Sequence, residues 1–513
     1  MQKGQSHAMS PTKETFSGPA PVLVIGAGPT GLSAAYHLGA ESLLLEQGST
    51  VGGWCRSIVD AGFTFDYAGH IMFTNDPYVL SLYELLLGAN VHWQDREAWI
   101  YSKGTYTRYP FQGALYGLPP DVIKECIVGA IEARFGSLNA KKGTEEIVPH
   151  DYTGPERRGM FEPLLHKTNG ATAFGGVDRR RPAPHKGPPR NFEEFIYKVW
   201  GAGIAKHFAI PYNRKLWAVP LEEMETSWLG GRVPLPNLEE MIDGALSPVP
   251  KPMGPNARFG YPLRGGFQAL MDGFVPHLRG KLRLGTGVAT ISPSRHSVTT
   301  VAGETIPFEY LVSTMPLPEL VRRIGDEAPE EIQSAARALR HVSVRCVNIG
   351  VGRENLTEKH WIYYPEDTVF HRIFVQGNAS PYCNPPGGFG LTCEITYSEA
   401  KPLPCDGDEL IRRCIEDCIK VGFFRRDDPI LCANQVDMPV AYVVYDHGRR
   451  ENVDLIRAWL LDHDIVLAGR YSEWEYYNSD HAFVAGKKAA EQVRELRQGQ
   501  VMAFPKAAVL SQR

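Results

Sequence analysis

Residues 22–31 read Val22-Leu23-Val24-Ile25-Gly26-Ala27-Gly28-Pro29-Thr30-Gly31, and this stretch decides the fold. The four apolar residues predict a buried strand, and residues 32–38 predict a helix. The glycines between them form a GxGxxG pattern in the strand–turn–helix context that a dinucleotide fingerprint requires. Gly26 allows the tight turn, Gly28 lets a pyrophosphate approach the backbone, and Gly31 lets helix and strand pack closely. The helix start, where Thr30 and Gly31 follow Pro29, would offer unpaired N–H groups to phosphate oxygens.

Segments further along the chain favour FAD over NAD as the dinucleotide. Glu46 ends a second predicted strand, twenty positions after Gly26, where a carboxylate accepts hydrogen bonds from ribose hydroxyls. A second glycine turn, Gly52-Gly53-Trp54, follows directly and would bring more backbone to the cofactor. Near the other end, a strand at 465–468 leads into Gly469-Arg470 and a helix that begins close to Ser479. Cofactor-binding segments at opposite ends of the chain are typical of FAD proteins.

The order of predicted elements indicates an α/β protein built around one discontinuous nucleotide-binding domain. We predict a Rossmann-type FAD-binding domain with an inserted, mostly helical substrate domain and an antiparallel β-sheet domain. The expected boundaries are a disordered lead at 1–20, an FAD domain at 21–76, 264–316 and 462–498, a helical substrate domain at 77–137 and 191–245, a mobile insertion loop at 138–190, and a β-sheet substrate domain at 95–112 and 340–450.

The pattern of apolar residues also predicts individual helices and strands. Helices are expected at 77–87, 119–134, 192–210, 406–421 and 481–497. A hairpin is expected around Lys103-Gly104, and strands at 283–290, 297–301, 310–313 and 464–468.

Composition excludes several classes of protein. The net charge of -4 over 513 residues gives no support for nucleic-acid binding. Nine scattered cysteines include no CxxC pair and no zinc spacing, so we expect reduced thiols and no metal site. No window is apolar and long enough to span a bilayer, and residues 1–20 lack the apolar core of a signal peptide. We therefore expect a cytoplasmic protein that acts on a small molecule; its oligomeric state is left open.

Several motifs together resemble the flavin-dependent UDP-galactopyranose mutases. They are Ala68-Gly69-His70, Tyr109-Pro110-Phe111-Gln112, the segment from Pro211 to Pro220 that begins Pro-Tyr-Asn-Arg-Lys-Leu-Trp, Arg232-Val233-Pro234-Leu235-Pro236-Asn237, Trp361-Ile362-Tyr363-Tyr364 with Arg372, and Gly469-Arg470-Tyr471 with Tyr476. Gly265-Gly266 also resembles a turn that lies near the flavin in the wider superfamily.

The resemblance implies interconversion of the pyranose and furanose forms of a nucleotide sugar, UDP-galactose or a related one, by attack of reduced-flavin N5 on the anomeric carbon. His70 would sit near the flavin, and Arg372, Tyr442 and Tyr476 would hold the diphosphate. The expected catalytic residues are His70, Arg372, Tyr442 and Tyr476. The expected substrate-binding residues are Arg96, Phe111, Gln112, Tyr212, Asn213, Trp217, Asn237, Trp361, Tyr363, Arg372, Tyr442 and Tyr476.

One departure from the family concerns charge at the substrate. The family places an arginine directly before its Pro-Tyr-Asn signature, where it helps to neutralise the diphosphate, but this chain has Ile210 there. Either Arg214 or another residue replaces it, or the substrate differs. The alternatives are therefore an FAD oxidase or dehydrogenase of the amine-oxidase or protoporphyrinogen-oxidase type, a mutase-like enzyme for a different sugar nucleotide, and a non-catalytic FAD-binding protein. NADPH is a candidate reductant by analogy, although the sequence offers no separate nicotinamide site.

Overall fold

The structure is a computed structural model that describes residues 21–138, 187–229, 237–249 and 257–499. The predicted lead at 1–20 and residues 139–186 of the predicted insertion loop lie outside the described residues.

The first layer is a five-stranded parallel sheet with the order β19-β13-β1-β2-β9. Every residue of the neighbouring strands β1 and β2 is buried, as expected for parallel strands covered on both faces. The early strands at 22–25 and 43–45 and the late strands at 310–313 and 464–468 are confirmed. The strands are β1 (Val22–Ile25), β2 (Ser42–Leu45), β9 (Lys281–Arg283), β13 (Tyr310–Ser313) and β19 (Ile465–Leu467).

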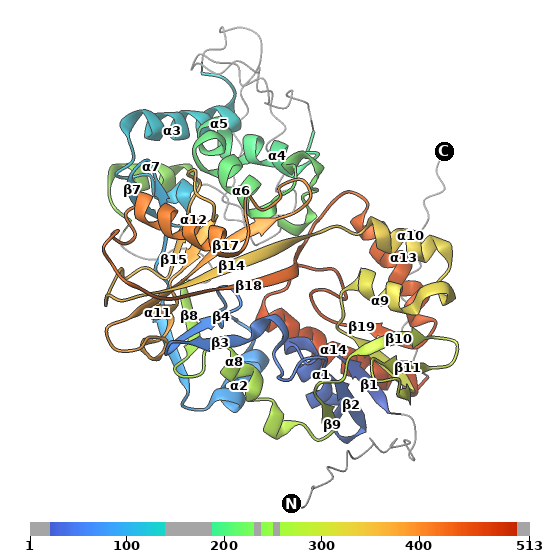
Figure 1. The fold of residues 1–513 in the computed structure, drawn as a ribbon. Helices are drawn as coiled ribbons and strands as arrows, with labels where there is room; N and C mark the ends of the chain where they lie inside the picture. Colours follow the sequence, from blue (N-terminus) through green and yellow to red (C-terminus); the bar gives the residue numbers. More distant parts are fainter. Residues whose placement is uncertain (1–20, 139–186, 230–236, 250–256, 500–513) are drawn as a thin grey trace, which may run out of the picture.

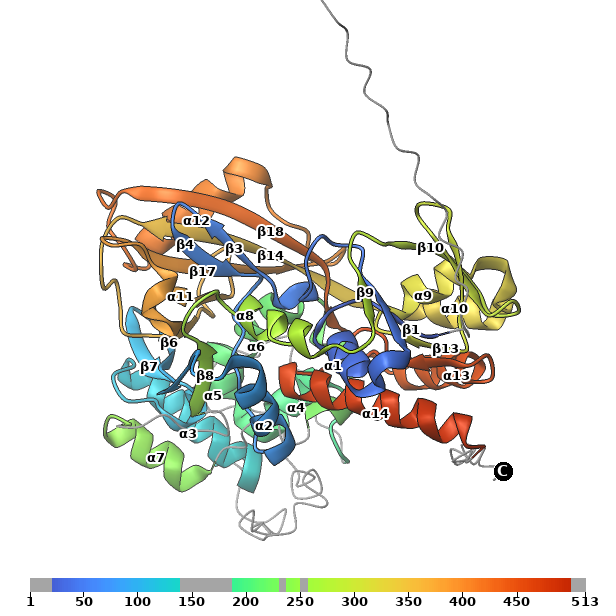
Figure 2. The same cartoon turned by 90° about the horizontal axis from the view of Figure 1, so that it is seen from below.

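Elements from the early and the late parts of the described chain meet on this sheet. Helix α1 (Pro29–Leu38) follows β1, and the last helix, α14 (Ser479–Arg497), packs along it. A Cβ at Gly486 of α14 would lie 2.3 Å from the main-chain oxygen of Thr30, so this close crossing requires glycine. The late strand and helix therefore complete the nucleotide-binding unit that the first thirty residues begin, as Figure 2 shows from below.

The prediction of one strand at 283–290 is wrong. Strand β9 ends at Arg283, and β10 (Val288–Ser292) begins a separate antiparallel sheet with β11 (Ser297–Thr300) and β12 (Thr305–Pro307). Gly285 adopts a φ of +62° in the turn between β9 and β10. The apolar pattern runs through this turn, so periodicity alone could not separate the two strands. Helix α9 (Leu317–Ile324) packs against β10 and against α10 (Glu330–Ala338), and α13 (Arg449–Leu461) packs between α10 and β19.

A seven-stranded sheet forms the second layer, in the order β18-β14-β17-β16-β15-β6-β7. Its neighbouring strands are antiparallel except β15 and β6, which are parallel. The predicted hairpin around Lys103-Gly104 is confirmed as β6 and β7. The strands are β6 (Ala98–Ser102), β7 (Thr105–Arg108), β14 (His341–Val351), β15 (Trp361–Tyr363), β16 (Arg372–Phe374), β17 (Phe389–Tyr397) and β18 (Ile430–Val443).

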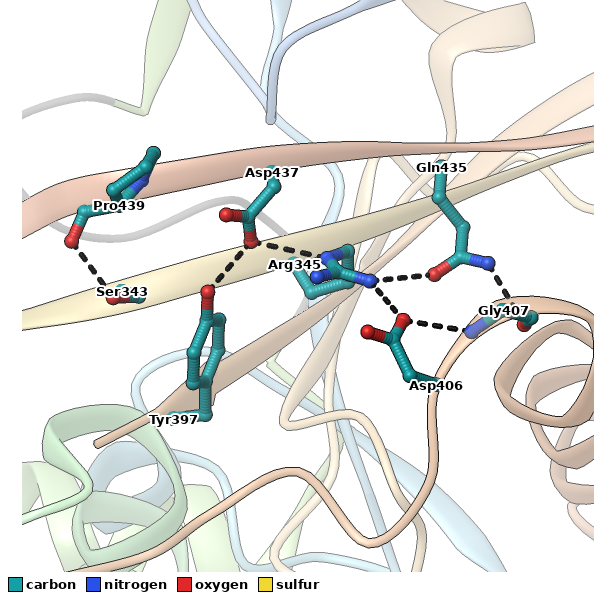
Figure 3. Close-up of polar contacts among 8 residues, drawn as sticks. All are labelled: Ser343, Arg345, Tyr397, Asp406, Gly407, Gln435, Asp437 and Pro439. Carbon is teal, nitrogen blue, oxygen red and sulfur yellow. Dashed lines mark hydrogen bonds and ion pairs between the residues drawn. The ribbon is translucent and has the colours of Figure 1, made fainter. Parts of the chain in front are cut away.

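Helix α12 (Gly407–Lys420) packs beside this sheet through buried residues such as Leu410 and Cys414. A polar cluster lies near its first turn (Figure 3). Arg345 of β14 donates to Asp437 (3.0 Å) and Gln435 (2.9 Å) of β18 and also binds Asp406, the N-cap of α12. Every charged member of this cluster has a partner, so its role is to join strand, strand and helix.

Most of the remaining helices gather above the seven-stranded sheet in Figure 1. The predicted helix at 192–210 is interrupted at Gly201, whose φ is +83° and whose Cβ would collide with the backbone of α3 at Gly129. Short helices and two π-helical turns replace it, leading into α6. The helices above the sheet are α3 (Pro120–Phe135), α4 (Phe192–Phe195), α5 (Gly201–Ile204), α6 (Ile210–Trp217) and α7 (Leu238–Leu246), whereas α2 (Pro77–Leu87) lies on the other side and contacts α14.

Short pieces join the two layers: β3 (Ser57–Asp60), β4 (Phe63–Asp66), β5 (Val91–Asp95), β8 (Arg258–Pro262), α8 (Gln268–Asp272) and α11 (Gln376–Ala379).

Candidate cofactor and substrate site

Two glycine turns face each other at the carboxyl end of β1. Gly28 caps the N-terminus of α1, and a Cβ at Gly53 would lie 3.2 Å from the Cα of Gly28. The Gly52 N–H donates to the carbonyl oxygen of Ala27 (2.7 Å), which fixes the second turn against the first. At Gly31 a Cβ would lie 1.8 Å from the oxygen of Gly26, so no other residue fits. The glycine backbone of both turns therefore lies at the helix start, which is the arrangement that a pyrophosphate requires.

Glu46 lies beside these turns at the end of β2. Its carboxylate accepts hydrogen bonds from the N–H groups of Ala27 (2.8 Å) and Gly48 (2.6 Å). These two bonds leave lone pairs for ribose hydroxyls, because a carboxylate can accept about four hydrogen bonds.

The late segment brings a cation to the same region. Arg470 donates to the carbonyl oxygens of Tyr477 (2.8 Å) and Ala441 (3.0 Å), and its Nε is buried with no hydrogen-bond partner among the described residues. The hydroxyl of Ser479, the first residue of α14, lies 3.4 Å from the oxygen of Ile71. The positive end of α14 thus lies next to the His70 segment.

His70 is held as a neutral imidazole. Its ring stacks on Phe267 with centroids 5.2 Å apart, and its Nδ1 lies 3.1 Å from the oxygen of Ala68. Desolvation lowers the pKa of His70 to about 4, so the ring is uncharged at neutral pH. A neutral ring whose Nδ1 faces a carbonyl oxygen donates from Nδ1, which leaves Nε2 as a hydrogen-bond acceptor.

A fully buried carboxylate fixes the turn that carries Gly265 and Gly266. Asp66 of β4 accepts from the hydroxyls of Ser57 (2.6 Å) and Tyr261 (2.7 Å) and from the N–H of Phe267 (3.0 Å). Burial raises the pKa of Asp66 to about 6, although these bonds favour the charged form. Asp66 therefore positions Phe267, on which His70 stacks.

The raised pKa of Asp66 should make the stability of the fold depend on pH. The folded protein binds the Asp66 proton more tightly than the unfolded chain does, because the pKa is about 6 in the fold and about 3.8 in the unfolded chain. Protonated Asp66 therefore stabilises the fold fully below pH 3.8, and this stabilisation is lost as the pH rises through 6. Relative to Asp66→Asn, wild-type stability should fall by about 2.4 kcal/mol between pH 4 and 7, out of a full effect of about 3 kcal/mol at about 1.4 kcal/mol per pKa unit. Melting temperatures of both proteins across this range test it; parallel pH profiles would contradict it.

Arg372 and Glu394 form a buried ion pair on adjacent strands. The Nη2 of Arg372 lies 2.6 Å from Glu394 Oε2, and its Nε donates to the same oxygen at 2.8 Å. The side chain of Glu394 has no exposed surface and also accepts from the N–H of Gly69 (3.2 Å). Arg372 further donates to the hydroxyl of Tyr442 (3.2 Å). The pair thus links the sheet to the segment that carries His70.

Aromatic rings surround this ion pair. Tyr442 and Tyr476 stack at 5.9 Å, and Trp217 of α6 meets both edgewise or tilted at 6.0 and 6.3 Å. Tyr363, which pairs with Arg372 across β15 and β16, contacts the rings of Tyr109 (5.2 Å) and Tyr212 (5.5 Å). The indole N–H of Trp217 is buried with no partner among the described residues.

The structure thus brings many of the predicted site residues together around Arg372 and His70. The side chains of others are engaged in packing or in hydrogen bonds elsewhere. Phe111 is fully buried and stacks on Phe208 at 4.9 Å. Asn213 donates to the oxygen of Ala209 in its own helical segment, and Asn237 caps α7 at an exposed position. Gln112 is buried, Trp54 packs on Tyr67 at 6.2 Å, and Trp361 stacks on Phe374 at 4.5 Å.

Glu394 is a candidate site residue that was not predicted from the sequence. A signal for it was present, since it is the one charged residue in the otherwise apolar or hydroxyl-bearing strand Phe389–Tyr397. A lone charge inside such a strand is rarely buried without a partner.

Comparison with known proteins agrees with this geometry. Residues 212–494 match the family described as flavin containing amine oxidoreductase, and residues 24–86 match an NAD(P)-binding Rossmann-like domain. The chain therefore belongs to the flavin-containing amine oxidoreductase family, which implies FAD as cofactor.

Among solved structures, the chain is similar to a reduced UDP-galactopyranose mutase. The identity is 28% and the TM-score 0.79, over 93% of this chain and 94% of that one. A putative protoporphyrinogen oxidase from Exiguobacterium sp. 255-15 shares 16% identity with a TM-score of 0.65, over 94% of this chain and all of that one, and shows the fold alone. The predicted resemblance and the predicted fold class are confirmed.

In the described ranges, no helix is long and apolar enough to cross a membrane. The same residues contain no cluster of three or more His, Cys, Asp or Glu side chains that could hold a metal ion.

Proposed function

We propose that this protein is a flavin-dependent mutase that interconverts the pyranose and furanose forms of a nucleotide sugar, UDP-galactose or a close relative. The observation that carries the proposal is the ion pair of Arg372 and Glu394, held with Tyr442 beside the His70 segment. A rigid guanidinium next to the cofactor suits an anionic leaving group, because planar N–H pairs match phosphate oxygens. The 28% identity to a UDP-galactopyranose mutase supports the same chemistry.

The described residues fit FAD. Gly26, Gly28, Pro29, Thr30 and Gly31 would hold the pyrophosphate with Gly52, Gly53 and Trp54 opposite, and Glu46 would hold the ribose. His70, Gly469, Arg470 and Ser479 would border the flavin ring. The buried, unpartnered Nε of Arg470 is one donor that a bound acceptor would satisfy. When bound in its reduced form, the flavin supplies a nucleophilic nitrogen, N5.

The residues of the chain would orient the substrate and stabilise developing charge. Arg372 and Tyr442 would receive the negative charge of the departing nucleotide, and Tyr476 would act from the neighbouring ring. The rings of Trp217, Tyr212 and Tyr363 exclude water, which strengthens these electrostatic contacts. Neutral His70 would accept a hydrogen bond at Nε2 and so influence the cofactor without adding charge.

Anaerobic conversion of UDP-galactofuranose, followed by chromatography, tests the proposal. We expect dithionite-reduced protein to form UDP-galactopyranose and oxidised protein to be inactive. If flavin binds and is reduced but UDP-galactofuranose is unchanged, the substrate assignment fails. Oxygen uptake with an amine or a porphyrinogen would instead identify an oxidase.

A further inference from the structure

Helix α6 does not supply the second cation that a diphosphate would need. Ile210, at the start of α6, is buried in the main apolar core. Arg214, one turn later, faces Glu193 at 3.5 Å. Lys215 donates from Nζ to Thr368 and to the main-chain oxygens of Tyr364 and Glu366, all at 2.9 Å. The two cations in this part of α6 are therefore engaged elsewhere.

With Arg372 as its one cation the site would be close to neutral, because the fully buried Glu394 offsets the charge of Arg372. Arg470 already donates to the main-chain oxygens of Tyr477 and Ala441, and its guanidinium lies against the rings of Tyr442 (5.1 Å) and Tyr476 (4.7 Å). The proposed function assigns its remaining donor, the buried Nε, to the flavin.

Arg96 is different, because no carboxylate among the described residues pairs with it. The adjacent Glu97 is taken by Arg108 (2.9 Å) and by the indole N–H of Trp99 (2.9 Å). Arg96 instead donates to the hydroxyl of Tyr363 (2.9 Å), and its Nε is buried with no partner in the described ranges.

Aromatic rings hold the Arg96 guanidinium in place. It lies 5.0 Å from the ring centre of Trp361 and 5.9 Å from that of Tyr109. Its bonding partner Tyr363 pairs directly with Arg372 across β15 and β16, so the two arginines reach the same tyrosine-lined region from different sides. Because the rings contact the flat faces of the guanidinium, the N–H groups at its edge stay available to bind a ligand.

We propose that Arg96 supplies the second cation for the phosphate groups of the nucleotide, in place of the arginine missing at position 210. This inference rests on the proposed function. Its chemistry is that of charge-assisted, bidentate hydrogen bonds from a guanidinium to phosphate oxygens.

Binding of UDP, UMP, uridine and inorganic pyrophosphate to the oxidised holoprotein tests the inference by calorimetry. In Arg96→Gln we expect UDP to bind about 30- to 100-fold more weakly, as for loss of one or two hydrogen bonds to a charged group. The affinity for UMP should fall less, and the affinity for uridine should change by less than about twofold, because Arg96 would contact only the phosphate groups. Arg96→Lys, which keeps the charge but not the planar fork, should fall between the two.

Arg264→Gln is the matched control, since Arg264 is also held by an aromatic ring, Tyr382, at 3.6 Å and is exposed. It should leave all four affinities unchanged. Equal weakening of UDP and uridine in Arg96→Gln, or no weakening of either, would overturn the inference while leaving the proposed function intact. If the wild type binds pyrophosphate but no uridine nucleotide, the proposed function fails, and the pyrophosphate affinities of wild type and variant decide the role of Arg96. If the wild type binds neither, both fail.

Discussion

Replacing Arg372 with glutamine is expected to lower kcat/KM for the nucleotide sugar by about a thousandfold, or about 4 kcal/mol of transition-state stabilisation. The side chain binds Glu394 and Tyr442, and in the proposed reaction its loss would remove the fixed positive charge where negative charge would develop. The same change leaves the fully buried Glu394 carboxylate unpaired, which should cost about 3–5 kcal/mol of stability.

A double variant separates these two effects. Arg372→Gln with Glu394→Gln removes the unpaired buried charge, so most of the stability should return while kcat/KM stays low. If the double variant regained activity, Arg372 would serve only to neutralise Glu394, and its assigned contact with the substrate would be wrong.

Arg345 provides the matched control on the same sheet (Figure 3). The side chains of Arg345 and Arg372 are 14% and 18% exposed, and both bind carboxylates. The partners of Arg345 are partly exposed aspartates near the first turn of α12 rather than a buried glutamate. Arg345→Gln should therefore lower the melting temperature but leave kcat/KM within about twofold, as expected for a substitution outside the transition-state contacts.

Replacing Gly28 with alanine is expected to abolish stable FAD binding without unfolding the protein. Gly28 has an ordinary φ of -74°, and a new Cβ would meet nothing closer than the Cα of Gly53 at 3.9 Å. The methyl group would instead occupy the approach to the helix start that the pyrophosphate needs. We expect FAD affinity to fall by about 100-fold or more, since several charge-assisted hydrogen bonds would be lost together.

The ratio of flavin to protein absorbance after purification, followed by reconstitution with FAD, measures this effect. Gly448→Ala is a suitable control, because Gly448 also has a negative φ (-93°) at a helix start and has room for a methyl group. Stoichiometric flavin in Gly28→Ala would show that the cofactor does not pass over this turn.

The sequence predicted the parts of the fold whose signals are local. The apolar run at 22–25, the glycines at 26–31 and Glu46 lie within 25 residues of one another, and the structure places Glu46 2.8 Å from the N–H of Ala27. Periodicity failed at 283–290 because the pattern carries no mark of the chain reversal at Gly285.

The candidate site depends on contacts between residues that are distant in the chain. Gly69 and Glu394 are 325 positions apart, and Asp66 and Phe267 are 201 apart. A single sequence shows that Asp66 and Glu394 are charged, but it does not show which N–H groups they meet. For Asn237 the resemblance predicts a contact with the sugar, whereas in the structure its side chain caps α7; its contact with the sugar stays a prediction.

In the proposed mutase reaction the flavin must be reduced, but no reducing equivalents are consumed overall, because substrate and product are isomers. The most direct measurement is the number of substrate molecules isomerised per flavin after one stoichiometric reduction, in an anaerobic cell with the flavin absorbance recorded throughout. A mutase should complete many turnovers while the flavin spectrum stays reduced, because the same electrons serve every cycle. Product limited to about one equivalent per reduced flavin, with reoxidation in step, would contradict the claim and identify a redox enzyme instead.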